Sequence, residues 1–242
     1  MAENRASAYT EGVPCWTDAQ LPDVEAGKRF YGELFGWSFE EKREYGGSVL
    51  ARLEGKPVAA LTRKADGRMP TEWTVYFSAP DARALSARVR ERGGQILGEA
   101  RRVGPYGAFL LAADPQGAVF GLWQPGLHQG FGLRHRPGAF GWVQLYARDT
   151  ETANAFYGAL FHEALFGPGA RPDFGRAAVS EVFDAGMPPH FLVHFRVADL
   201  PDALAVVDRL GGRVRAAPFE TSYGTVAVVA DDQGASFALQ QR

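Results

Sequence analysis

The sequence lacks several features that would by themselves assign a class of protein. Its 242 residues include a single cysteine, Cys15, so no intrachain disulfide can form and cysteines cannot build a metal site. No run of about 18 apolar residues occurs, and the polar residues 1–12 lack the apolar segment of a signal peptide. We therefore expect a cytoplasmic protein that does not partner a membrane.

An excess of charge of one sign is also absent. The 26 Lys and Arg residues are nearly balanced by 28 Asp and Glu residues, and the formal net charge is −2. Such a chain has no general electrostatic attraction for nucleic acid or for an anionic membrane surface. Nucleic acid is therefore not an expected partner.

The chain contains two long segments that are nearly repeated. Residues 30–37 read FYGELFGW and residues 156–163 read FYGALFHE, while YGAFLLAADPQGAVFGLWQ at 106–124 returns as YGTVAVVADDQGASFALQQ at 223–241. The period of about 120 residues is too long for a solenoid unit. We predict one domain at residues 1–125 and another at residues 139–242. The Gly- and Pro-rich residues 126–138 are predicted to be a linker that crosses the surface.

Each copy divides again into two halves of similar pattern. A strand opens each half, at residues 13–21, 72–79, 140–147 and 190–197. Each strand is followed by an aspartate that can cap a helix, namely Asp23, Asp81, Asp149 and Asp199. Shorter strands follow each helix, except that the third half is abbreviated and its residues 167–175 are predicted to be a mobile loop. The pattern predicts an α+β fold of four βαβββ units.

Several of these segments carry a family resemblance. They are W-x-D at residues 16–18, FYGELFGW, the glycine pair 93–94 and DPQGAVFGLWQP, with weaker echoes in FYGALF and DDQGASFALQQ. Together they resemble the vicinal oxygen chelate superfamily of glyoxalases, bleomycin-resistance proteins and extradiol dioxygenases, over residues 12–241. The resemblance implies two glyoxalase-like domains, in which curled mixed sheets surround cavities.

The same resemblance implies positions for a divalent metal ion. Metal-binding members carry His, Glu or Gln on the first strands of paired units and on last strands. Those positions fall here on Trp16, Thr74 and Gly121 in the first copy, and on Trp142, Leu192 and Ala238 in the second. None is a competent ligand, Thr74 being at best a weak one. His190 and His194 share a strand but lie about 13 Å apart at that spacing. We predict no metal ion and no cofactor.

Alternation along the strands predicts which side chains face the two cavities. Tyr106 and Tyr223, each before a glycine at the same repeat position, are predicted at the cavity rim, or alternatively pack a turn. The expected ligand-binding residues are Trp16, Asp18, Thr74, Tyr76, Tyr106 and Trp123 in the first copy, and Trp142, Gln144, Tyr146, Leu192, His194 and Tyr223 in the second.

Broad aromatic side chains with a few polar neighbours suit a planar ligand. We predict metal-independent binding of a planar aromatic or polycyclic molecule, for sequestration, self-resistance or support of a biosynthetic pathway. The alternative is a cofactor-free isomerase, cyclase or lyase, with Asp18 and His194 as catalytic acid or base. A third interpretation is that the tryptophans only fill the interiors of the curled sheets and that no ligand binds. A metal-dependent dioxygenase or glyoxalase is a weaker fourth. A biosynthetic enzyme and a second copy of the chain are the candidate protein partners.

Overall fold

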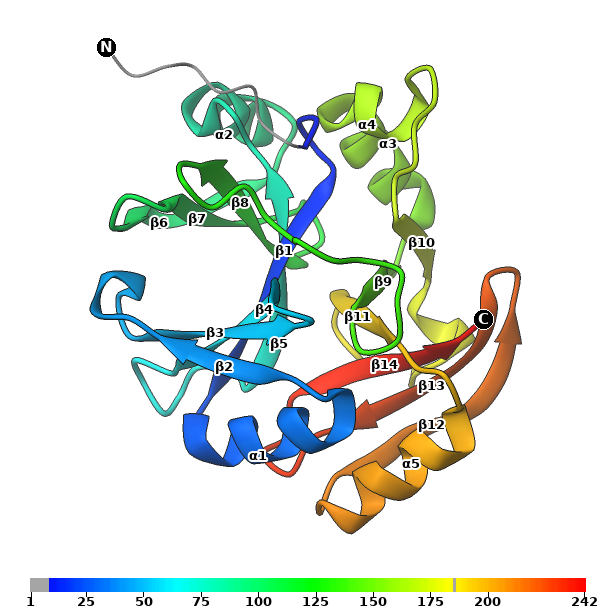
Figure 1. Ribbon diagram of the computed structural model, residues 1–242. Coiled ribbons are helices and arrows are strands. Elements are labelled where there is room, and N and C mark those ends of the chain that lie inside the picture. Colours follow the sequence, from blue (N-terminus) through cyan, green and yellow to red (C-terminus); the bar gives the residue numbers. More distant parts are fainter. Residues whose placement is uncertain (1–8, 185) are drawn as a thin grey trace.

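The computed structural model describes residues 9–184 and 186–242, and two curled sheets dominate it (Figure 1). The elements of the first sheet region are β1 (Pro14–Leu21), α1 (Val24–Phe35), β2 (Ser38–Glu41), η1 (Arg43–Tyr45), β3 (Ser48–Leu53), β4 (Lys56–Arg63), β5 (Glu72–Ser78), α2 (Ala82–Glu91), β6 (Gln95–Val103), β7 (Gly107–Ala113) and β8 (Val119–Pro125). Its eight strands follow the order β2-β3-β4-β1-β5-β8-β7-β6.

The second sheet is smaller. Its region comprises β9 (Phe140–Ala147), α3 (Thr150–Leu160), α4 (His162–Phe166), β10 (Phe174–Ala178), η2 (Val179–Glu181), β11 (His190–Arg196), α5 (Leu200–Arg209), β12 (Arg213–Thr221), β13 (Gly224–Ala230) and β14 (Ser236–Gln241). The six strands follow the order β10-β9-β11-β14-β13-β12. The predicted α+β class with curled mixed sheets is confirmed.

The third unit departs from the predicted βαβββ pattern. Within the described residues it contributes only β9 and β10 to the sheet, in agreement with the abbreviated third unit expected from the sequence. Phe174 and Gly175, expected in a loop, begin β10 and pair in parallel with β9. The strand β6, which has no clear apolar alternation, was not located from the sequence.

The pairing of units was open from sequence alone. Antiparallel pairing of β1 with β5 joins the first two units, and antiparallel pairing of β9 with β11 joins the last two. Each sheet therefore curls around an interior built from neighbouring units of the same copy. No helix in the described part of the chain is long and apolar enough to cross a membrane.

The helix ends follow the local sequence. Asp23 accepts hydrogen bonds from the backbone N–H groups of Glu25 and Ala26 at 2.9 and 3.1 Å, which satisfies donors that the first turn leaves free. Gly36 ends α1 with a φ of 71°, a left-handed conformation that glycine adopts without steric cost. These caps confirm the predicted start and end of α1.

An aromatic core lies between the two sheets. The ring of Phe195 on β11 lies 5.0 Å from the rings of Phe35 and Trp73, and 5.5 Å from that of Trp37. Phe195 is fully buried. Helices α1 and α5 lie side by side at one end of this core (Figure 1). The copies therefore share one continuous core rather than resting on a polar interface.

Two reverse turns connect the copies in a reciprocal way. We call residues 114–117 and 231–234 the cross-copy turns. The Gln233 side chain accepts from the backbone N–H of Asp23 at 2.8 Å and donates to the carbonyl of Asp23 at 2.9 Å. Gln116 makes the same pair of bonds with Asp149, both at 2.8 Å. Each turn thus holds the N-terminus of the helix that belongs to the other copy.

Buried tyrosines complete this arrangement. Tyr31 of α1 donates to Asp231 at 2.8 Å, and Tyr157 of α3 donates to Asp114 at 3.2 Å. Burial raises the pKa values of both aspartates, and the tyrosine hydrogen bonds oppose that rise. Asp114 and Asp231 also shape their own turns, as the sequence indicates. Their contact with the opposite copy was not foreseen.

The segment between the copies is not a simple surface crossing, contrary to prediction. The side chain of Phe131 is only 6% exposed and stacks on Phe140 with ring centroids 4.6 Å apart. The Phe131 N–H donates to the carbonyl of Cys15 at 2.8 Å, and the Gly132 N–H donates to that of Pro57 at 2.7 Å. Apolar burial and these bonds to β1 and β4 hold the segment against the first sheet.

Candidate functional site

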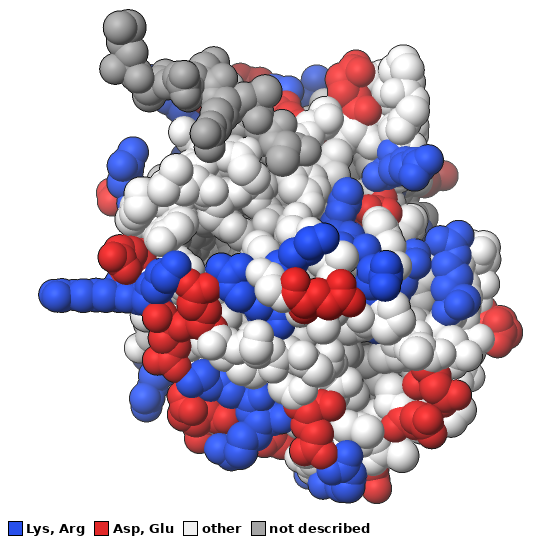
Figure 2. Space-filling view, in the orientation of Figure 1, with Lys and Arg blue, Asp and Glu red and all other residues white. Residues whose placement is uncertain are grey.

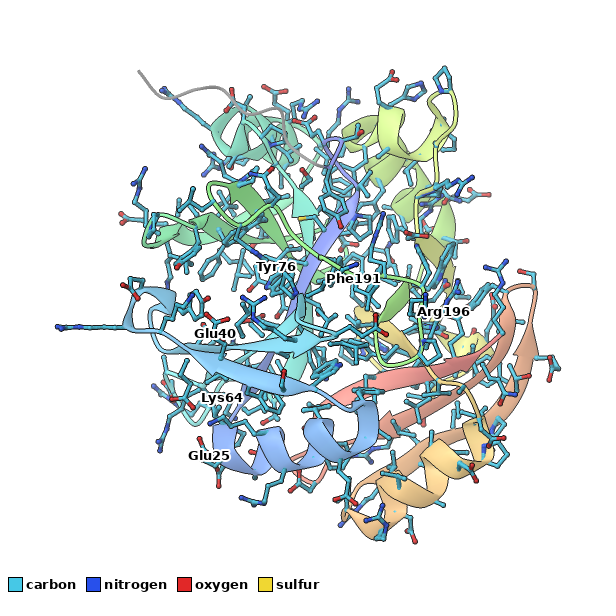
Figure 3. The ribbon with its side chains drawn as sticks, viewed as in Figure 1. Glu25, Glu40, Lys64, Tyr76, Phe191 and Arg196 are labelled. Atoms are coloured by element: carbon cyan, nitrogen blue, oxygen red, sulfur yellow. The ribbon has the colours of Figure 1, made fainter. Side chains whose placement is uncertain are left out.

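A cavity of about 270 Å³ lies inside the first sheet. Strands β1 and β5 occupy the centre of the sheet order, and β3–β4 and β7–β8 flank them on either side. Tyr76 lies in the space between these two halves of the sheet (Figure 3). Five predicted residues are brought together as its lining, namely Trp16, Asp18, Tyr76, Tyr106 and Trp123.

Asp18 is the acidic group of this cavity and is 8% exposed. Its Oδ1 accepts from the Tyr76 hydroxyl at 3.0 Å, and its Oδ2 accepts from Gln20 at 2.8 Å and from Thr62 at 3.2 Å. Burial raises the pKa of Asp18 to about 6, although these hydrogen bonds oppose the rise. The carboxyl can therefore exchange a proton near neutral pH.

Tyr76 is held in place by a close approach to the neighbouring strand. It pairs with Gly121 on β8, where a Cβ atom would lie 2.0 Å from the Tyr76 ring. Only glycine leaves room for the ring at this position. The ring also meets Phe109 edge-on at 5.8 Å, so packing and the bond to Asp18 fix the orientation of Tyr76.

Trp16 and Trp123 form an aromatic wall together with His128, which sequence analysis placed in the linker. The His128 ring centroid lies 4.2 Å from that of Trp16 and 5.5 Å from that of Trp123. The Trp123 indole donates to the His128 carbonyl at 2.9 Å. Burial, with a smaller contribution from the Arg52 charge, lowers the pKa of His128 to about 4. The imidazole is neutral at pH 7.

Two tyrosines and Arg52 lie along another part of the lining. Tyr106, from the loop before β7, contacts Tyr45 of η1 with ring centroids 4.9 Å apart. Glu40 on β2, labelled in Figure 3, accepts from Tyr45 at 3.1 Å and from Arg52 at 2.5 Å. Further lining residues that sequence reasoning missed are Tyr45, Leu50, Arg52, Phe109, Leu127 and His128.

Thr74 does not reach the cavity. It is buried, and its backbone carbonyl accepts from the Thr17 hydroxyl at 2.8 Å. Thr74 pairs with Asp18 on the adjacent strand, so it lies beside the site. The side chains that line the cavity do not include that of Thr74.

The predicted residues of the second sheet also meet, but they pack against one another. Tyr223 stacks on Trp142 at 5.2 Å with an interplanar angle of 24°. Trp142 and Tyr223 both donate to the Gln144 side-chain oxygen, at 3.0 and 3.4 Å. These three residues form a closed group that fills part of the second interior.

Apolar side chains also pack together in that interior. Tyr146 and Leu192 pack in a buried cluster with Val179, Val226 and Val228. His194 is fully buried, and within the described chain neither ring nitrogen has a hydrogen-bond partner. Burial lowers the pKa of His194 to about 3. His194 and Asp18 therefore belong to different interiors and do not form a catalytic pair.

The positions that the resemblance implies for a metal do not offer suitable donors. Indole has only an N–H donor, so Trp16 and Trp142 cannot coordinate a cation. At Gly121 the Tyr76 ring occupies the space that a ligating side chain would need. No cluster of three or more His, Cys, Asp or Glu side chains suited to a metal occurs among the residues described. These positions do not fit a divalent ion, and metal independence itself stays a prediction.

Charge on the outer surface shows no dominant sign on the face in view. Figure 2 shows Lys and Arg side chains intermixed with those of Asp and Glu. Several form ion pairs, such as Lys28 with Glu41 and Arg209 with Glu33. The face in view therefore presents no extended patch of one charge.

Comparison with known proteins identifies the family. The model of the Glyoxalase/Bleomycin resistance protein/Dioxygenase superfamily matches residues 16–122. The putative glyoxylase CFP32 of Mycobacterium tuberculosis (strain CDC 1551 / Oshkosh) is 34% identical, with 97% of each chain covered. The chain belongs to this superfamily, as the repeated segments indicated.

Two further proteins are similar to this chain, one in sequence and one in structure. The anthracycline biosynthesis protein DauV of Streptomyces sp. (strain C5) is 33% identical, covering 96% of this chain and 94% of the relative. Among solved structures, the 2,3-dioxygenase LapB from Pseudomonas sp. KL28 superposes with a TM-score of 0.64 at 14% identity, covering 97% of this chain and 94% of LapB. The structural similarity at this identity shows the fold alone.

Proposed function

We propose that the first-sheet cavity binds a planar polycyclic aromatic molecule without a metal ion, in support of a biosynthetic pathway, of sequestration or of self-resistance. The observation that carries the proposal is the lining of Trp16, Trp123, Tyr76 and Phe109 around the single carboxyl of Asp18. Concave apolar cavities with a few placed polar groups are the usual sites for small molecules. The similarity to an anthracycline biosynthesis protein supports a polycyclic ligand.

The second sheet provides a natural contrast. Trp142 occupies the position in the repeat that is equivalent to Trp16, and it stacks on Tyr223 and donates to Gln144. This packing supports a structural role for the second copy. We therefore assign ligand binding to the first copy and packing to the second.

Replacing Trp16 with alanine should weaken binding of a hydroxyanthraquinone at least tenfold. One aromatic contact contributes about 0.5–1.5 kcal/mol beyond its buried area, and a tenfold change corresponds to about 1.4 kcal/mol. Isothermal titration calorimetry with 1,8-dihydroxyanthraquinone measures the affinity without relying on the removed indole. Tryptophan fluorescence quenching of the unaltered protein gives an independent check.

Trp142→Ala is the matched control and should retain the affinity of the unaltered protein. Equal affinities of Trp16→Ala and the unaltered protein would contradict the assigned cavity. Protein dialysed against a chelator and assayed without added metal should bind equally well. A loss of binding that added zinc, iron or manganese restores would contradict the metal-independent proposal.

A second candidate function rests on the raised pKa of Asp18. A carboxyl with a pKa of about 6 that faces a cavity can act as a general base near neutral pH. Tyr76, bonded to Oδ1, would orient the carboxyl. The candidate is a cofactor-free isomerase, cyclase or lyase that uses Asp18 without His194.

This alternative predicts turnover that Asp18→Asn removes. Loss of a general base typically lowers the rate by about 10²–10⁴-fold, while the aromatic contacts that bind the ligand remain. Product formation is followed by chromatography and mass spectrometry on compounds that bind in the calorimetric assay. If a bound compound is recovered unchanged after long incubation, the enzyme alternative is wrong and only the binding function remains.

A further inference from the structure

One buried ring nitrogen of a cavity-lining residue has no hydrogen-bond partner among the described residues. The Nε2 atom of His128 is buried, and no partner for it occurs in the described part of the chain. His128 lines the first-sheet cavity. Buried polar atoms nearly always have a partner, and leaving one unsatisfied costs about 1–3 kcal/mol. A ligand atom in the cavity could supply the missing bond.

Two backbone hydrogen bonds and an aromatic contact hold His128 in place. The Trp123 indole donates to the backbone carbonyl of His128. The backbone N–H of His128 donates to the Tyr106 carbonyl at 3.0 Å. Trp16 meets the imidazole edge-on at 80°. The backbone contacts do not depend on the imidazole, so substitution of the side chain leaves them intact.

The protonation state of His128 restricts the ligand chemistry. A neutral imidazole nitrogen donates in one tautomer and accepts in the other, and this ring is neutral at pH 7. It can therefore pair with a carbonyl or a hydroxyl oxygen. Burial is the main cause of the lowered pKa of His128, and the neighbouring Arg52 charge makes a smaller contribution.

Asp18 provides a second polar point on the same wall. Its Oδ1 atom accepts only the Tyr76 bond in the described structure, which leaves acceptor capacity for a ligand hydroxyl. Trp16 and Asp18 lie two residues apart on β1 and both line the cavity. An aromatic ligand that stacks on Trp16 therefore has the polar side chains of Asp18 and His128 in the lining of the same cavity.

We propose that His128 determines specificity in this cavity, and that the ligand is an oxygenated planar aromatic, a quinone or a phenol, whose oxygen hydrogen-bonds to His128 Nε2. The inference rests on the proposed binding function and narrows it. It predicts that the cavity binds aromatic rings that carry oxygen more tightly than hydrocarbon rings of the same shape. His128 acts by binding the oxygen, and no covalent step is involved.

The test compares 9,10-anthraquinone with anthracene, which shares its three rings but lacks the two oxygens. Calorimetry on the full chain should show at least tenfold tighter binding of anthraquinone, equivalent to about 1.4 kcal/mol. In His128→Phe the preference should fall below about threefold, through weaker anthraquinone binding. His128→Gln, which retains a donor and an acceptor, should restore part of the preference. His162→Phe, at an exposed histidine, should change neither affinity.

The outcomes separate this inference from the proposed function. If the unaltered protein binds neither compound, the proposed function fails and the inference fails with it. If it binds both equally, or if His128→Phe keeps the preference, the binding function stands and the role of His128 is wrong. If His128→Phe weakens both compounds alike while its melting temperature is unchanged, His128 shapes the cavity without recognising oxygen.

Discussion

Replacing Phe195 with alanine is expected to lower the free energy of unfolding by about 3–5 kcal/mol. The ring is fully buried and contacts Phe35, Trp37 and Trp73 of the first copy and Phe237 of its own. Truncation removes these contacts and leaves a cavity that the rigid strands around it cannot close. Equilibrium unfolding in urea, followed by circular dichroism, gives the difference.

Phe166→Ala is the matched control for this change. The Phe166 side chain is 60% exposed at the end of α4, so its loss should change stability by less than about 0.5 kcal/mol. Two separate unfolding transitions in Phe195→Ala would be consistent with weakened coupling between the copies. A Phe195→Ala protein as stable as the control would contradict the packing of β11 against the first sheet.

Asp18→Asn is expected to stabilise the protein at pH 7, by an amount that depends on pH. The folded-state pKa of about 6 lies above the ordinary value of 3.8, so the folded protein binds the proton more tightly than the unfolded chain does. Stability therefore falls as pH rises from about 4 to 6, and the loss is complete above the folded pKa. The size is about 3 kcal/mol, because one pKa unit corresponds to about 1.4 kcal/mol.

The difference between the unaltered protein and Asp18→Asn isolates this effect, since contributions from other groups largely cancel. The stability advantage of Asp18→Asn should be larger at pH 7 than at pH 3 by about 3 kcal/mol. Asp208→Asn, at an exposed position on α5, should show no such dependence. A stability difference for Asp18→Asn that is constant between pH 3 and 7 would contradict a buried carboxyl with a raised pKa.

Much of the fold was predictable because its signals are local. Asp23 and Asp149 cap the starts of α1 and α3, and Gly36 ends α1 in a left-handed conformation. The strand β6 was missed because its residues are mostly exposed and lack apolar alternation. The cross-copy turns were read only as turns, since sequence does not reveal which distant helix their side chains meet.

The site was predictable to the extent that it lies on regular strands. Alternation placed Trp16, Asp18 and Tyr76 on the inner face correctly, but a face does not specify depth, and Thr74 lies beside the cavity. Tyr45 and His128 come from irregular segments, whose position depends on how the sheet curls. Phe131, an aromatic residue within the segment predicted to be a linker, was the available signal that this segment packs against the sheet.

The cross-copy turns make each half of the chain the partner that completes the other. A lone half would leave a helix start without its glutamine bonds and a buried tyrosine without its carboxylate, so an unduplicated version would need a second identical chain in a reciprocal dimer. Joining the halves in one polypeptide makes that association independent of concentration. It also allows the two interiors to differ, so that one carries a lined cavity while the other carries the stacked pair of Trp142 and Tyr223.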